Sequence, residues 1–367
     1  MNAPLPPGPP PRPDWKVSID GLSAFAECID VRTPAEFAED HVPGAVNLPV
    51  LNDDERARVG TMYVQVSAFD ARKVGAALVA RNIARIVETY AREKPREWQP
   101  LVYCWRGGQR SRSLVHVLCE IGWRAAQLDG GYRAYRRYVV SSLATRPQQL
   151  RFRLVCGLTG CGKSRLLAAL AAEGGQVLDL ERIARHRGSL LGDMLDQPQP
   201  SQKAFESGLL GVLASFDPQR VVYVESESRK IGAVQLPDAL LAQMRTSPCL
   251  RVETPQPLRV ALLKDEYEHF LVATDVLSKR LVRLSPLYGK KVVERWGAMA
   301  AGGDHDALID ELLTLHYDPT YTRSIEQNFP RQPEALIAEV RDISSSGFRA
   351  LARDVLARTA ELQTLAA

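Results

Sequence analysis

The sequence lacks several features that would each have defined a class of protein. Its 367 residues contain no uninterrupted apolar run of membrane-spanning length, so we expect no membrane partner. None of its six cysteines belongs to a Cys-x-x-Cys pair, which argues against a structural zinc site and a disulfide framework. Reduced thiols are typical of the cytoplasm, where we expect the protein. The net charge is only +4, so a nucleic-acid partner has to be inferred from local patches.

The arrangement along the chain predicts an α/β protein with more than one domain. Apolar strand-like runs alternate with helical periodicity, which is typical of parallel sheets. The first 14 residues have no apolar core and many prolines, so we expect a disordered lead and no secretory signal. We place the parts at 1–14 (lead), 15–140 (first domain), 141–149 (linker), 150–254 (second α/β domain) and 255–367 (mostly helical region).

The stretch YCWRGGQRSRSL places Cys104 between a predicted strand and a predicted helix. Backbone N–H groups of such a glycine-containing loop can surround an anion, and the helix N-terminus adds partial positive charge. We therefore predict a nucleophilic thiolate at the base of an anion-binding loop. The alternative is a buried cysteine that only closes a strand. The predicted loop residues are Arg106, Gly107, Gly108, Arg110 and Ser111.

A second glycine-rich stretch, GLTGCGKS, fits the phosphate-loop pattern G-x-x-x-x-G-K-S. It follows a predicted strand and opens a predicted helix, which is the context that the pattern requires. We interpret Cys161 inside it as a small filler. The predicted diphosphate-binding residues are Gly157, Gly160, Gly162, Lys163 and Ser164. We expect no tightly bound cofactor, and the candidate ligands for a Mg²⁺ ion are Ser164, Asp179 and Glu225.

A basic stretch without any Asp or Glu runs from Gly130 to Ala172 and has tyrosines between its arginines. Basic and aromatic side chains together suit a nucleic-acid backbone with an exposed base. The alternative is the solvated face of a helix. The candidate RNA-binding residues are Arg133, Arg136 and Arg137 in this stretch, and Arg185 and Arg187 in a second basic cluster.

The motifs IDVRTPAEFAEDHVPGAVNLP and LDGGY resemble the signatures of the rhodanese domain. That resemblance implies that Cys104 carries a sulfur or selenium atom. Five residues separate Cys104 from Arg110, a spacing that phosphatase relatives use to hold phosphate, so we expect the loop to accept a phosphate-sized group. Tyr103 stands where those phosphatases usually have histidine.

A rhodanese domain followed by a phosphate-loop domain, with DLERIARHRGSLLG and VYVESESRKIG, resembles the tRNA 2-selenouridine synthase family over nearly the whole chain. The resemblance implies that sulfur of 2-thiouridine at the tRNA wobble position is replaced by selenium from selenophosphate, through S-geranylation by geranyl diphosphate. It implies tRNA as the partner, with selenophosphate synthetase as a further candidate. Two alternatives remain open: an ATP-dependent tRNA sulfurtransferase or kinase, and a non-catalytic rhodanese module that senses RNA or nucleotides.

Overall fold

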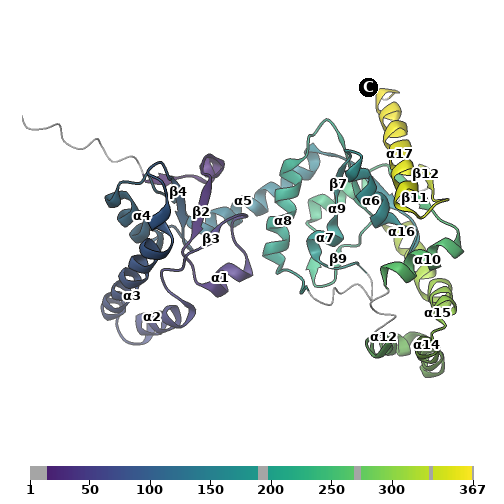
Figure 1. The fold of residues 1–367 in the computed structure, drawn as a ribbon, viewed down its shortest axis with the longest axis horizontal. Helices are drawn as coiled ribbons and strands as arrows, with labels where there is room; N and C mark the ends of the chain where they lie inside the picture. The colour runs from purple at the N-terminus through teal and green to yellow at the C-terminus, as the bar shows by residue number, and fades with distance from the viewer. Residues whose placement is uncertain (1–14, 189–196, 268–273, 330–333, 366–367) are drawn as a thin grey trace, which may run out of the picture. The chain divides into compact units, whose positions relative to one another are not determined.

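The computed structural model describes residues 15–188, 197–267, 274–329 and 334–365, so the predicted lead lies outside the described residues. The chain divides into two compact units (Figure 1). The first ends at Ser142 and also includes Glu206–Gly208, and the second holds the rest. Each unit contains a five-stranded parallel sheet, which confirms the predicted α/β class.

The sheet of the first unit has the strand order β1-β5-β4-β2-β3. Its middle strand β4 is buried along its whole length, since it is built from the apolar run that precedes Cys104. Helices α3 and α4 lie side by side (Figure 1) and cover a core that includes Ile29, Val102 and Leu114. The strands are β1 (Lys16–Val17), β2 (Glu27–Asp30), β3 (Val46–Asn47), β4 (Pro100–Tyr103) and β5 (Ala126–Leu128). The helices are α1 (Pro34–Glu39), α2 (Asp53–Gln65), α3 (Ala68–Thr89), α4 (Gln109–Ile121) and α5 (Gly131–Thr145).

The sheet of the second unit has the order β12-β11-β6-β8-β7, with a small antiparallel pair β9–β10 beside it. Its strands are β6 (Arg151–Cys156), β7 (Gln176–Leu178), β8 (Val221–Glu225), β11 (Cys249–Glu253) and β12 (Leu336–Glu339), and the pair is β9 (Lys230–Ile231) and β10 (Val234–Gln235). Helices near the sheet are α6 (Lys163–Ala172), α7 (Leu180–Ala184), α8 (Gln202–Ser215), α9 (Asp238–Thr246) and α17 (Ser345–Leu365).

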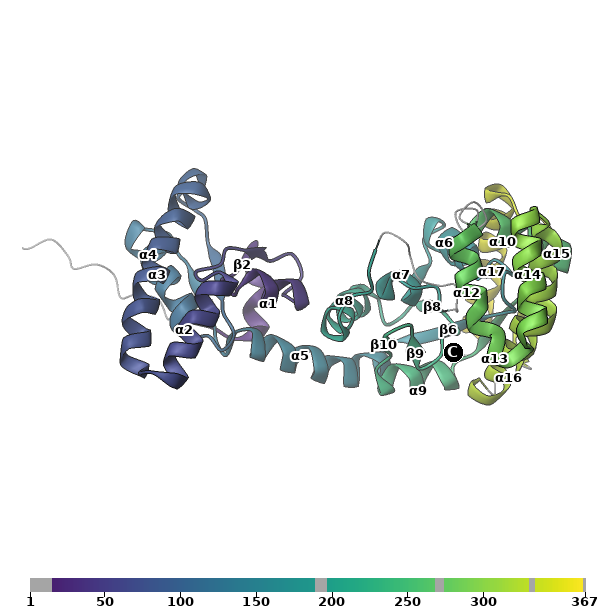
Figure 2. The ribbon, with the colours of Figure 1, turned by 90° about the horizontal axis from the view of Figure 1, so that it is seen from below.

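The remaining helices of the second unit gather in one region (Figure 2), partly around the buried Trp296. They are α10 (Gln256–Glu266), α12 (Thr274–Leu281), α13 (Ser285–Tyr288), α14 (Lys290–Gly302), α15 (His305–Leu312) and α16 (Asp318–Asn328). The sequence interpretation of the C-terminal region as mostly helical did not include β12. That strand pairs with β11, and α17 then packs on α6, so the end of the chain completes the sheet domain.

The residues interpreted as a linker, 141–149, are helical in the structure. Helix α5 continues to Thr145, and a 3₁₀ turn occupies Arg146–Gln149. The reason is that Tyr135, Val139 and Leu143 are all buried and follow one another at the four-residue spacing of a helix face. None of the helices that the structure describes is both long and apolar enough to cross a membrane.

Candidate active sites

Cys104 directly follows β4, and the loop after it leads into α4, as the sequence predicted. The cysteine is 3% exposed. Its Sγ accepts two hydrogen bonds at 3.2 Å, one from the backbone N–H of Gly108 and one from the hydroxyl of Ser111. Two donors converge on this one sulfur and hold it at the base of the loop. A nucleophilic role for Cys104 nevertheless stays a prediction.

Gln127 supports this loop from the neighbouring strand β5, and the sequence analysis did not identify it. Its side-chain amide donates to the Ser111 hydroxyl at 2.8 Å and to the Gly108 carbonyl at 3.0 Å. Because the Ser111 oxygen accepts from Gln127, its own hydrogen is free to point at the sulfur. The available signal was a glutamine in the otherwise apolar, fully buried strand AQL.

The closing motif LDGGY touches the cysteine loop. The Tyr132 backbone N–H donates to the carbonyl of Cys104 at 2.8 Å. Gly131 has a φ of +56°, and a Cβ atom there would overlap that same carbonyl oxygen. Only glycine therefore allows the backbones of the motif and of the loop to approach this closely.

The arginines of the loop differ in their surroundings. Arg110 is mostly buried and its guanidinium forms an ion pair with Glu36, 2.9 Å between Nη1 and Oε2. Although burial works against it, this hydrogen bond lowers the pKa of Glu36. Arg106 is exposed to solvent. Glu36, from the first rhodanese-like signature, thus holds one loop arginine in place.

The phosphate loop joins β6 to α6, as the sequence predicted, and Gly157, Gly160 and Gly162 all have positive φ. A Cβ atom on Gly162 would lie 2.6 Å from the ring of Phe348 on α17, so glycine is required there. The Lys163 ammonium donates to the carbonyls of Gly157 at 2.7 Å and of Leu158 at 3.2 Å.

A cavity of about 650 Å³ opens on one face of this loop and brings Lys163 and Ser164 together with acids and arginines. Burial, and then the neighbouring Glu227 carboxylate, raise the pKa of Glu181 to about 8. The Ser164 hydroxyl lies 3.4 Å from Oε2 of Glu181. Neither Glu181 nor Glu227 was predicted from the sequence, because nothing in the motif indicates which later acids fold against it.

The residues proposed for Mg²⁺ are not equivalent. Asp179 lines the cavity, but its carboxylate caps α7 by accepting the Arg182 N–H at 2.8 Å. Glu225 is buried outside the lining, and its Oε1 accepts the Glu181 N–H at 2.8 Å. Burial raises the pKa of Glu225 well above its ordinary value. Among the described residues, no group of three or more His, Cys, Asp or Glu side chains could hold a metal ion, so Mg²⁺ stays a prediction.

The candidate RNA-binding arginines of α5 separate into two kinds. Arg133 and Arg137 are exposed. Arg136 is 15% exposed and forms ion pairs with Asp40, at 3.7 Å, and with Glu206 of the same unit. Its charge is therefore largely compensated within the protein.

The two arginines of the second basic cluster also differ in their surroundings. Arg185 is exposed and ends α7 in the left-handed conformation, with a φ of +50°. Arg187 instead lines the phosphate-loop cavity, where it donates to the Glu266 carbonyl at 3.0 Å and lies 5.1 Å from the centre of the Tyr267 ring. Its position suits an anionic ligand of the cavity better than an RNA backbone.

Helix α16 covers the phosphate loop with residues that sequence reasoning missed. Its Asp318 forms a double hydrogen-bonded pair with Arg259, and Arg259 also donates to the Thr159 carbonyl at 2.7 Å. One turn later, the Tyr321 ring centre lies 4.8 Å from the Lys163 ammonium, and the Tyr321 hydroxyl is 2.6 Å from Ser226. Burial raises the pKa of Tyr321 to about 12, so this hydroxyl is neutral at physiological pH.

Comparison with known proteins matches each unit to a domain family. Residues 20–138 match the rhodanese-like domain, and residues 150–282 match the tRNA 2-selenouridine synthase AAA domain. The tRNA 2-selenouridine synthase of Marinobacter nauticus is 33% identical and is aligned over 89% of this chain and 95% of its own length. The synthase of Nitrosomonas europaea is 37% identical and is aligned over 68% of this chain and 67% of its own length. The synthase of Salmonella newport is 32% identical and is aligned over 83% of this chain and 91% of its own length. The chain belongs to the tRNA 2-selenouridine synthase family, and it is a tRNA-modifying enzyme.

Proposed function

We propose that the protein replaces the sulfur of 2-thiouridine at the wobble position of tRNA with selenium in two steps, each served by its own loop. The observation that carries the proposal is the presence of two separate loops of the kind that bind anions. One surrounds the hydrogen-bonded Cys104 sulfur, and the other presents Lys163 and Ser164 to a cavity of about 650 Å³.

In the first step, geranyl diphosphate binds at the phosphate loop. The thiocarbonyl sulfur attacks C1 of the geranyl group, the C1–O bond breaks and diphosphate leaves, while the N3 proton of the base passes to solvent. Burial alone would lower the pKa of Lys163, but nearby Cys161 and Tyr321 raise it, so the side chain is a full ammonium. After a side-chain rotation it can offset the charge that grows on the leaving diphosphate. Arg165 and Arg187 line the same cavity.

The oxygen ligands near the loop suit Mg²⁺. This ion usually takes one or two carboxylates together with substrate phosphates. Ser164 and Glu181 place a hydroxyl and a carboxyl group 3.4 Å apart, and the carboxyl group would lose its proton on binding the ion. When bound by these two residues, the ion would supply further neutralisation of the diphosphate charge.

In the second step, selenophosphate binds at the Cys104 loop. The Cys104 sulfur attacks C2 of the base, and geranylthiol leaves with a proton from solvent. Selenium of selenophosphate then attacks C2 and displaces the Cys104 sulfur, and water cleaves the Se–P bond to release phosphate. S-alkylation matters because a thiocarbonyl sulfur is a poor leaving group, whereas the alkylated sulfur leaves as a thiol. Cys104 is the candidate nucleophile, and its loop is the candidate phosphate cradle.

Two variants test the division of labour. Lys163→Ala should block geranylation, because one such interaction with developing charge is worth on the order of 3 kcal/mol, roughly a hundredfold in rate. Cys104→Ala should still geranylate and should accumulate geranylated 2-thiouridine, as measured by mass spectrometry of tRNA. Pre-geranylated tRNA should rescue only Lys163→Ala. Loss of geranylation in a folded, tRNA-binding Cys104→Ala protein would contradict the division of the two steps between the two loops.

ATP turnover by the purified protein, without binding of geranyl diphosphate, would instead favour a kinase.

A further inference from the structure

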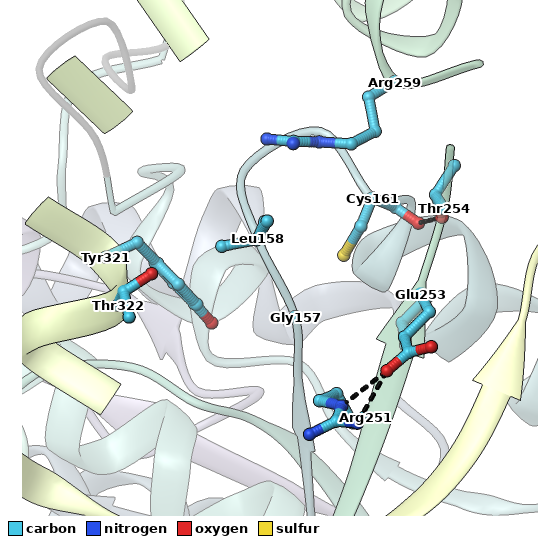
Figure 3. A pocket seen from close by; sticks show the side chains of 10 residues that line it. Gly157, Leu158, Cys161, Arg251, Glu253, Thr254, Arg259, Tyr321 and Thr322 are labelled. Atoms are coloured by element: carbon cyan, nitrogen blue, oxygen red, sulfur yellow. Dashed lines mark hydrogen bonds and ion pairs between the residues drawn. The ribbon is translucent and has the colours of Figure 1, made fainter. Parts of the chain in front are cut away.

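A second cavity, of about 330 Å³, lies against the same phosphate loop and shares only Tyr321 with the first cavity among its lining residues (Figure 3). Leu158 and Cys161 come from the loop, Val252 comes from β11, and Tyr321 and Thr322 come from α16. Figure 3 shows Leu158 and Cys161 on the loop, with Tyr321 and Thr322 on the helix beside it. Its volume is at the small end of ligand-binding sites, which span about 300–1,000 Å³.

The charged side chains around this second cavity, and Thr254, are already paired with protein groups. Arg251 hydrogen-bonds Glu253 at 2.8 Å, and Thr254 donates to the Cys161 carbonyl at 2.8 Å. Arg259 donates hydrogen bonds to Asp318 and to the loop carbonyl of Thr159. A nucleoside needs hydrogen-bonding partners for its base and ribose, and these paired groups are poor partners for it. A hydrocarbon needs none.

Tyr321 lines both cavities. Lys163 lines the first cavity, and its ammonium contacts the carbonyls of Gly157 and Leu158, two residues of the second cavity. A ligand with its diphosphate at the phosphate loop could therefore extend its other end past Tyr321 into the second cavity.

We propose that the second cavity binds the hydrocarbon chain of the allylic diphosphate, with the reacting C1 atom beside Tyr321. This inference rests on the proposed function, because it names the part of that site that recognises the chain. When the C1–O bond breaks and the C1–S bond forms, positive charge develops on the allylic carbons. The face of the Tyr321 ring, which already has a cation 4.8 Å from its centre, is suited to stabilise that charge.

This placement predicts a preference for chain length. Each methylene group that moves from water into an apolar cavity improves affinity by about fourfold. Geranyl diphosphate should therefore bind much more tightly than dimethylallyl diphosphate, which is five carbons shorter, and dimethylallyl diphosphate more tightly than inorganic diphosphate.

The test compares the affinities of the full-length protein for inorganic diphosphate, dimethylallyl diphosphate and geranyl diphosphate by calorimetry. Thr322 is exposed at the rim of the second cavity, so Thr322→Trp should fill the cavity without disturbing the core. We expect it to lower the preference for geranyl diphosphate over inorganic diphosphate at least tenfold and to leave the affinity for inorganic diphosphate unchanged. Arg323→Trp is the matched control, because Arg323 is exposed on the same helix and is not among the lining residues of either cavity. It should leave the preference for the chain intact.

The outcomes separate this inference from the proposed function. If the unmodified protein binds geranyl diphosphate no more tightly than inorganic diphosphate, the prenyl donor itself is wrong. If it shows the preference and Thr322→Trp retains it in full, the donor stands and the cavity assignment is overturned. Leu158→Ser, on the facing wall, provides a second variant should Thr322→Trp fail to fold, and it should also reduce the preference.

Discussion

The hydrogen bond from Ser111 to Cys104 permits a sharp test of how the cysteine loop activates its sulfur. Ser111 is completely buried, and its hydroxyl is one of two donors to Sγ. Ser111→Ala removes that donor and leaves the Gly108 N–H as the other. Gln127 keeps the Gly108 carbonyl as a partner for its amide, so the fold should lose only about 1 kcal/mol of stability.

The expected effect on reactivity is larger than the effect on stability. A hydrogen bond to a charged group contributes about 1.5–3 kcal/mol, so its loss should slow the reaction of the Cys104 sulfur about 10- to 100-fold. The assay is the rate at which iodoacetamide modifies the Cys104-containing peptide at pH 7, followed by mass spectrometry. The other five cysteines serve as internal references.

Ser113→Ala is the matched control. Ser113 lies on the same helix, but its hydroxyl is exposed and donates to the Gln109 carbonyl instead of to the sulfur. It should react at the rate of the unmodified protein. If Ser111→Ala also reacts at that rate, or if both variants slow equally, the Ser111 hydroxyl does not activate the Cys104 sulfur.

Two further predictions concern RNA binding and pH. Replacing exposed Arg133 and Arg137 with alanine should reduce the slope of log affinity for tRNA against log salt concentration by about 1–2, because two phosphate contacts release fewer counterions. Arg136→Ala should change that slope little, since its charge is paired internally; a slope that is the same in all three proteins would place the tRNA elsewhere. Glu181 has a pKa raised from 4.5 to about 8, so the folded state holds its proton more tightly than the unfolded chain and stability falls as pH rises through that window. Glu181→Gln should therefore gain stability relative to the unmodified protein by roughly 1 kcal/mol per pH unit between pH 5 and 8 in urea titrations, and a difference that does not vary with pH would show that Glu181 is not titrating there.

The sequence by itself determined the α/β class, the order of the two sheet domains and the place of both loops between a strand and a helix. Those features depend on neighbouring residues. Glycines at fixed positions supply the positive φ angles around Lys163, and the apolar run before Cys104 makes a buried strand that delivers the cysteine to its loop. The same locality limits two interpretations. The polar residues 141–149 suggested a linker, and the boundary between the two units falls within them although they are helical. The short apolar run at 336–339 was not separated from the helices around it.

Only the tertiary structure decided which distant side chains complete each site. Gln127 reaches the cysteine loop because β5 pairs with β4, and Glu181 reaches Ser164 because α7 follows a strand of the same sheet. Tyr321 meets Lys163 across more than 150 residues of sequence, through a helix whose position depends on the Arg259–Asp318 pair. Contacts of this kind are set by packing and by the satisfaction of buried polar groups, and neither leaves a periodic or contiguous pattern in the chain.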